Sequence, residues 1–141
     1  MVNKPILDQA KAFLCWDMFP GLVIQLIEVQ EAVSYFLPPS GRNTIVVYYE
    51  RGNPDFSLPL FFLFHEVGHY LQFKDMEKAG KQSDFWEIIN IPTGSSKITF
   101  EEESWSMGRG IFRRFIQKHG LDEQLLKYYN KVARRCVDSY C

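Results

Sequence analysis

Residues 57–73 read SLPLFFLFHEVGHYLQF, a stretch that is apolar at almost every position except around two histidines and one glutamate. Apolar residues on all sides of a segment this long predict a buried, central helix, here over about Leu58–Phe73. Ser57 is expected to cap its N-terminus, with Pro59 tolerated in the first turn. The ionisable residues of this stretch should therefore lie on the element around which the rest of the chain packs.

His65, Glu66 and His69 form the pattern HExxH within this helix. Residues four apart share one helix face, so the two imidazoles can bind a single ion without bending the backbone. Glu66 lies about 100° round the helix, where it can act as general base on a water at that ion. Two satisfied core histidines are the alternative, but three buried ionisable groups are costly without a metal. The pattern predicts a Zn²⁺ site with His65 and His69 as ligands.

A catalytic zinc ion takes three protein ligands and keeps one position open. Gln72 and Asp75 stand where a longer histidine motif would have Gly and His, so the third ligand should be a carboxylate. The run Glu101, Glu102 and Glu103 is the obvious source.

Helical phase separates these three glutamates. In a helix expected over about Thr99–Lys118, Glu101 falls on the apolar stripe, where a carboxylate is expensive unless it is paired or metal-bound. Glu102 can form a capping box with Thr99, and Glu103 points further away. Glu101 is therefore the predicted ligand. The alternative remains that all three glutamates only complement the positive end of a helix.

The other predicted elements make the chain a single α+β domain over residues 1–141. They are a helix over Pro5–Met18, strands over Leu22–Ile27 and Thr44–Tyr49, a less clear strand over Val33–Leu37, a turn at Pro38–Gly41, a short element over Phe85–Ile89, a loop at Thr93–Ser96, and a last helix over Leu121–Val137. Gly108 is expected to let the glutamate helix approach the histidine helix.

Composition limits the classes of binding partner and the cellular locations to expect. The 141 residues carry 16 basic and 17 acidic side chains, a net charge of −1, which gives no reason to expect direct nucleic-acid binding or membrane binding. Three widely spaced cysteines do not form a disulfide framework, and the N-terminus does not read as a signal peptide. We therefore expect a cytoplasmic protein with reduced thiols. The oligomeric state stays open.

Residues 63–69, LFHEVGH, resemble the core motif of the ImmA/IrrE family of small intracellular zinc peptidases. Residues 101–108, EEESWSMG, are similar to the family's later motif, with Glu101 at the ligand position; the pair of motifs is the gluzincin arrangement. The sequence departs at Trp105, where the family often has an Asn or Asp that orients a zinc histidine. The resemblance, over about residues 44–115, implies a zincin-like fold: a small twisted sheet packed on the HExxH helix, with further helices behind.

The resemblance also implies function, namely hydrolysis of a peptide bond in a protein partner such as a repressor or other transcriptional regulator. Two alternatives remain: a non-catalytic zinc-containing module that binds or regulates another protein, and a hydrolase of a non-peptide amide. The presence of Glu66 favours chemistry, because metal binding alone does not need it. Gln72 could line the cleft or be an ordinary helix-end residue. The candidates for stabilising an oxyanion are left unranked: Tyr70, Arg109, His119, Tyr128 and Tyr129.

Overall fold

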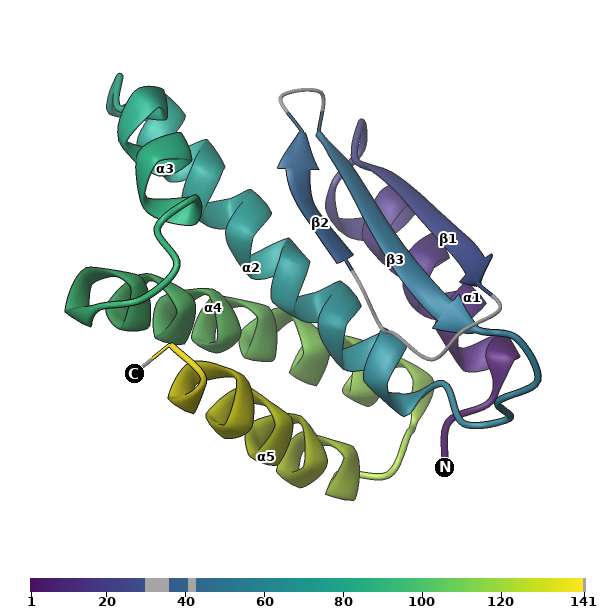
Figure 1. The fold of residues 1–141 in the computed structure, drawn as a ribbon. Coiled ribbons are helices and arrows are strands. Elements are labelled where there is room, and N and C mark those ends of the chain that lie inside the picture. Colours follow the sequence, from purple (N-terminus) through teal and green to yellow (C-terminus); the bar gives the residue numbers. More distant parts are fainter. Residues whose placement is uncertain (30–35, 41–42, 141) are drawn as a thin grey trace. The chain divides into compact units, whose positions relative to one another are not determined.

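The computed structural model describes residues 1–29, 36–40 and 43–140, with the backbone alone for 36–40. It has the predicted α+β class. Its elements, in order, are α1 (Lys4–Ala12), the π-helical η1 (Phe13–Met18), β1 (Val23–Val29), β2 (Phe36–Ser40), β3 (Thr44–Glu50), α2 (Ser57–Lys78), α3 (Gln82–Ile89), α4 (Ser95–His119) and α5 (Gln124–Asp138) (Figure 1). The chain divides into two compact units, Met1–Glu66 and Val67–Cys141. The single domain stays a prediction.

The first unit contains a mixed three-stranded sheet in the order β1-β3-β2 (Figure 1). β1 runs parallel to β3 in a register from Val23 opposite Thr44 to Val29 opposite Glu50, and β2 runs antiparallel to β3. In β1 and β3, alternate residues turn inward, and Ile24, Ile45 and Val47 are buried. This period of two is what places β-branched residues on one covered face.

The predicted turn at Pro38–Gly41 is wrong over its first three residues, because β2 continues to Ser40. Proline lacks the N–H that a central strand needs, and it is tolerated at a sheet edge or at a bulge. β2 meets both conditions: β3 is its one partner among the described strands, and the pairing register shifts between Leu37 and Ser40. Gly41 and the residues 33–35 of the less clear predicted strand lie outside the described residues.

The helix over Pro5–Met18 is confirmed as α1 followed directly by η1. The predicted cap at Ser57 is wrong, since Ser57 is already helical and Asp55 accepts hydrogen bonds from its N–H and its hydroxyl. Burial alone would raise the pKa of the Asp55 carboxyl, but the hydrogen bonds from Ser57 and Val2 lower it overall. α2 continues to Lys78, five residues beyond the predicted end.

The start of α4 overturns two predictions. The helix begins at Ser95, so the predicted loop at Thr93–Ser96 ends early, and Thr99 lies inside the helix and cannot form a capping box with Glu102. The first turn of α4 is held by a tertiary interaction, because the Lys97 ammonium donates to the carbonyl of Ile89 in α3 at 2.8 Å. This contact with α3 could not be predicted from local sequence preference.

The ends of the last two helices follow from local signals. α4 ends at His119, and Gly120 takes the left-handed conformation (φ 61°) that commonly terminates a helix, as predicted. α5 begins at Gln124, three residues later than predicted, with the Asp122 carboxylate accepting from the Gln124 N–H. Figure 1 shows α5 running back alongside α4.

The second unit packs aromatic residues from several helices. Phe73, Phe85 and Phe100 form one buried cluster, with ring centroids 5.2 Å apart for the first pair and 5.6 Å for the second. Tyr129 of α5 is fully buried beside Trp105 of α4. No helix within the described ranges has both the length and the apolar character that crossing a bilayer requires.

Candidate metal centre

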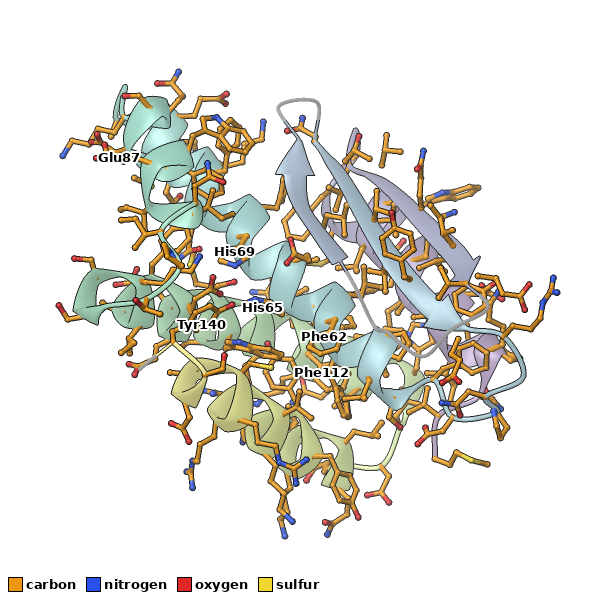
Figure 2. All side chains as sticks on the ribbon, viewed as in Figure 1. Phe62, His65, His69, Glu87, Phe112 and Tyr140 are labelled. Atoms are coloured by element: carbon orange, nitrogen blue, oxygen red, sulfur yellow. The ribbon has the colours of Figure 1, made fainter. Side chains whose placement is uncertain are left out.

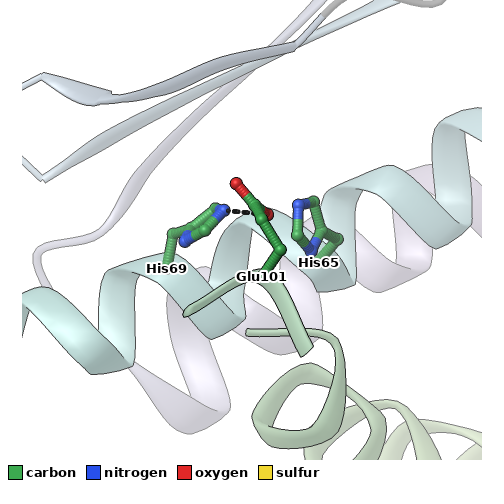
Figure 3. Close-up of side chains that lie close together, drawn as sticks. All are labelled: His65, His69 and Glu101. Atoms are coloured by element: carbon green, nitrogen blue, oxygen red, sulfur yellow. Dashed lines mark hydrogen bonds and ion pairs between the residues drawn. The ribbon is translucent and has the colours of Figure 1, made fainter. Parts of the chain in front are cut away.

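The structure brings together the three side chains that the sequence nominated as ligands. His65, His69 and Glu101 are 3%, 2% and 3% exposed. One ligand atom from each lies within 4.8 Å of the other two. In Figure 3 the Glu101 carboxylate lies between the two imidazole rings. A buried group of this composition could hold a metal ion.

The two histidines owe their placement to one uninterrupted helix. α2 carries His65 and His69 one turn apart, and Figure 2 shows both side chains leaving α2 on the same side. The ring of Phe100 stacks on His69 at a centroid distance of 5.1 Å and an interplanar angle of 27°. This contact restricts the tilt of the His69 ring.

Gly68 explains how Glu101 reaches a histidine from another helix. A Cβ atom at Gly68 would lie 1.9 Å from the carbonyl oxygen of Ser104 and 2.6 Å from its carbonyl carbon. α2 and α4 therefore approach at a distance that only glycine permits. Glu101 lies one turn before Ser104 on α4, which brings its carboxylate to His69. Gly68 was not singled out from the sequence, which pointed to Gly108 for this role; Gly108 is buried on α4, and its part in the approach stays a prediction.

Gln72 determines which nitrogen of His69 carries a proton. Its Oε1 lies 2.8 Å from His69 Nδ1, and its Nε2 donates to the carbonyl of Phe100 at 2.8 Å. A backbone carbonyl only accepts, so the amide nitrogen must face Phe100 and the amide oxygen must face the imidazole. Nδ1 of His69 therefore carries the hydrogen that Gln72 accepts, and in the neutral ring Nε2 keeps a lone pair.

The other side of His69 provides a test of whether a metal fits. His69 Nε2 lies 3.0 Å from Oε2 of Glu101. A neutral imidazole nitrogen and an ionised carboxylate oxygen are both acceptors, so this contact calls for a cation between or beside them, either a proton or a metal. Two imidazole nitrogens and one carboxylate oxygen are a ligand set found in catalytic zinc sites. The residues present fit such an ion.

Lys97 also belongs to this buried polar group, and it was not predicted from the sequence. It is 4% exposed, and its ammonium lies 3.0 Å from Oε1 of Glu101 while also donating to Ile89. The two oxygens of Glu101 thus face different partners, Lys97 on one side and His69 on the other. The spacing of four between Lys97 and Glu101 was the available signal, but it counts only once the helix is known to begin at Ser95.

The remaining glutamates of the triplet are placed differently. Glu102 and Glu103 are exposed, and both line an open groove along α4 and α5. Glu101 is the buried member of the three. The half-buried Cys136 is also near, but burial and the negative charge of Glu101 raise the pKa of its thiol. The ligand group that the geometry gives consists of His65, His69 and Glu101 and does not include this thiol.

Trp105, the departure from the family motif, is occupied in packing. It is 1% exposed, and its ring meets that of Tyr129 at 5.1 Å with an interplanar angle of 69°. The Tyr129 hydroxyl donates to the Trp105 carbonyl at 2.7 Å, and burial raises the pKa of Tyr129 well above its usual value. These contacts give Tyr129 a structural role as a hydrogen-bond donor within the α4–α5 packing.

The other candidates for stabilising an oxyanion are scattered over the structure. Arg109 donates to the side chain of Asn130, and Tyr128 is 52% exposed on α5. His119 is the last residue of α4. Tyr70 is buried on α2 immediately after His69, with the Lys74 ammonium 5.7 Å from its ring centroid.

Comparison with known proteins gives no match to a family model, to a curated protein or to a solved structure. The resemblance to the ImmA/IrrE family therefore rests on the two motifs quoted above.

Proposed function

We propose that this protein is a zinc-dependent peptidase with a zincin-like fold, in which His65, His69 and Glu101 hold the metal and Glu66 is the general base. The observation that carries the proposal is the buried group of two imidazoles and one carboxylate, with the nitrogen and oxygen of His69 and Glu101 only 3.0 Å apart. A base beside such a group is needed for hydrolysis and unnecessary for a structural ion.

The donor set favours zinc among the common divalent ions. Imidazole suits zinc better than calcium or magnesium, and three protein ligands leave the fourth position open for chemistry. A bound zinc ion would lower the pKa of a coordinated water to about 7 and polarise the carbonyl of the substrate.

Glu66 supplies the proton transfers that hydrolysis needs. Its side chain is 1% exposed and it adjoins His65 in the chain, about 100° round α2. We assign it the proton of the attacking water, whose oxygen bonds to the carbonyl carbon. When the carbon–nitrogen bond breaks, the same carboxyl returns that proton to the leaving amine. The reaction consumes one water and leaves Glu66 as it began.

The proposed substrate class comes from the sequence resemblance. The resemblance of the two motifs to the ImmA/IrrE family implies a protein substrate in the cytoplasm, such as a transcriptional regulator. The α+β class and the buried HExxH helix support a zincin-like arrangement, and the mixed sheet offers β-strand edges of the kind to which an extended peptide can add.

Metal content tests the ligands. Purified wild-type protein should hold one zinc ion, and His65→Ala and Glu101→Ala should lose it, as measured by elemental analysis after dialysis. Glu102→Ala is the matched control, because Glu102 is exposed on the same helix and should keep its zinc. Full zinc occupancy in Glu101→Ala would refute the third ligand.

Glu66→Gln tests the chemistry separately from the metal. This variant should keep its zinc but cleave a peptide library about 10²–10⁴-fold more slowly, as followed by mass spectrometry, since that is the usual contribution of a general base. Unchanged cleavage would remove Glu66 as the base. Zinc binding with no cleavage by the wild type would favour the non-catalytic module instead.

A further inference from the structure

Gln72 lies inside α2, which continues to Lys78, so the interpretation of Gln72 as a helix-end residue is wrong. It is 6% exposed, and both ends of its amide are engaged: the oxygen with His69 Nδ1 and the nitrogen with the carbonyl of Phe100, each at 2.8 Å. One partner is a nominated metal ligand, and the other is the residue directly before Glu101. The amide therefore links α2 to α4 at the point where both present a ligand.

We propose that Gln72 is a positioning residue that locks His69 in the tautomer and ring orientation in which Nε2 faces the metal. This inference rests on the proposed zinc site. Imidazole can bind a metal through either nitrogen, and a partner on one nitrogen decides which is left for the ion. Here the Gln72 oxygen occupies Nδ1, and Nε2 faces the Glu101 carboxylate.

The chemistry of an amide is what this position requires. Phe100 offers an acceptor and His69 Nδ1 offers a donor, so the side chain between them must both donate and accept. A carboxylate at position 72 would face the Phe100 carbonyl with two acceptors, and an apolar side chain would leave the buried carbonyl and the imidazole N–H without this partner. Glutamine satisfies both groups with one planar unit.

The position also completes a clamp around the His69 ring. Gln72 fixes the ring at its Nδ1 edge, while the Phe100 ring stacks on one face. Phe100 supports both: its carbonyl accepts from the Gln72 amide, and its ring stacks on His69. A polar partner for the histidine is thus supplied from α2 itself, while Trp105 is committed to packing against Tyr129.

Zinc affinity of Gln72→Met provides the main test, because methionine has nearly the same length and no amide. With a competing chromophoric chelator, this variant should bind Zn²⁺ about 10–100-fold more weakly than wild type. Gln72→Glu keeps an acceptor for Nδ1 and should bind more tightly than Gln72→Met. The control is Gln117→Met, the same replacement at an exposed position of α4, which should match wild type.

Two further readouts separate positioning from a purely structural role. In ¹⁵N spectra of the imidazoles, wild-type His69 should carry a proton on Nδ1 both with and without zinc, and Gln72→Met should lose this preference. The Co²⁺ absorption bands of Gln72→Met should also shift, because a metal held by a reoriented ring has a different geometry. A structural role alone would lower the unfolding free energy and leave both spectra unchanged.

The outcomes distinguish this inference from the proposed function. If wild type binds Zn²⁺ and Gln72→Met binds it within twofold, with the same ¹⁵N and Co²⁺ spectra, Gln72 does not position the histidine and the metal centre stands. A wild-type His69 with an unprotonated Nδ1 would also overturn the inference. If wild type fails to bind Zn²⁺ although Nδ1 is protonated, the metal centre is wrong, and with it the role of Gln72 toward a metal.

Discussion

Two regions of the chain, residues 1–64 and residues 65–104, bury different kinds of side chain. Among the described residues, every buried side chain from Val2 to Phe64 is apolar, and none carries a charge or an amide. All the buried polar and charged side chains lie in one later stretch of forty residues: His65, Glu66, His69, Gln72, Lys97, Glu101 and Ser104. The change comes inside α2, just before the boundary between the units at Glu66.

The difference shows where the fold requires specific contacts that burial of apolar surface does not require. Burying apolar surface is favourable by about 25 cal/mol per Å² and needs no particular partner. A buried polar group is unfavourable unless specific atoms meet it. Between residues 65 and 104 such atoms are present, with Gln72 between His69 and Phe100, and Lys97 bound to Glu101. A stretch that requires this many matched contacts is where function is best sought.

Removing the buried lysine should cause the largest loss in the free energy of unfolding among the variants that test this contrast. Lys97→Met removes the lysine partner of Glu101, and breaking a buried ion pair from one side typically costs about 3–5 kcal/mol. We expect a loss of this size in the unfolding free energy of the metal-free protein, measured by urea denaturation. Lys127→Met, at an exposed position of α5, should change the unfolding free energy by less than about 0.5 kcal/mol. Equal effects of the two variants would show that the Lys97–Glu101 pair is unimportant.

A pair of glycine substitutions sharpens the contrast at the helix crossing. Gly68→Ala places a methyl group 1.9 Å from the Ser104 carbonyl oxygen, so α2 and α4 must separate, which should cost about 3 kcal/mol and weaken metal binding. Gly110→Ala lies within α4 with nothing inside 4 Å of the new atom. It should stabilise the protein by about 0.5–1 kcal/mol through helix propensity. Thermal unfolding and zinc titration of both variants check the opposite signs.

The smallest expected effect belongs to the apolar region, residues 1–64. Ile45→Val removes one buried methylene from a fully covered position in β3 and should cost about 1 kcal/mol. Its zinc affinity should equal that of wild type, since no polar contact of the metal centre changes. A loss of zinc affinity here, comparable with that of Gln72→Met, would contradict the division between an apolar core and a polar one.

Much of this arrangement could be predicted from residue patterns. The apolar run at 57–73 predicted α2, the β-branched run at 44–49 predicted β3, and Gly120 predicted the end of α4. Helical phase selected Glu101 as the member of its triplet that faces the core. The start of α4 and the strand through Pro38 and Pro39 were not accessible, because each depends on a distant partner: α3 for the first and β3 for the second.

The sequence by itself determined the spacing of two imidazoles and a base along one helix, because the period of a helix is a local property of the chain. Tertiary structure decided everything that joins α2 to α4. The glycine that permits their approach, the amide that orients His69 and the lysine that compensates Glu101 act across gaps of 28 to 36 residues or at a helix start set by α3. Such contacts form only when the helices pack, so their energies leave no periodic trace in the residues themselves.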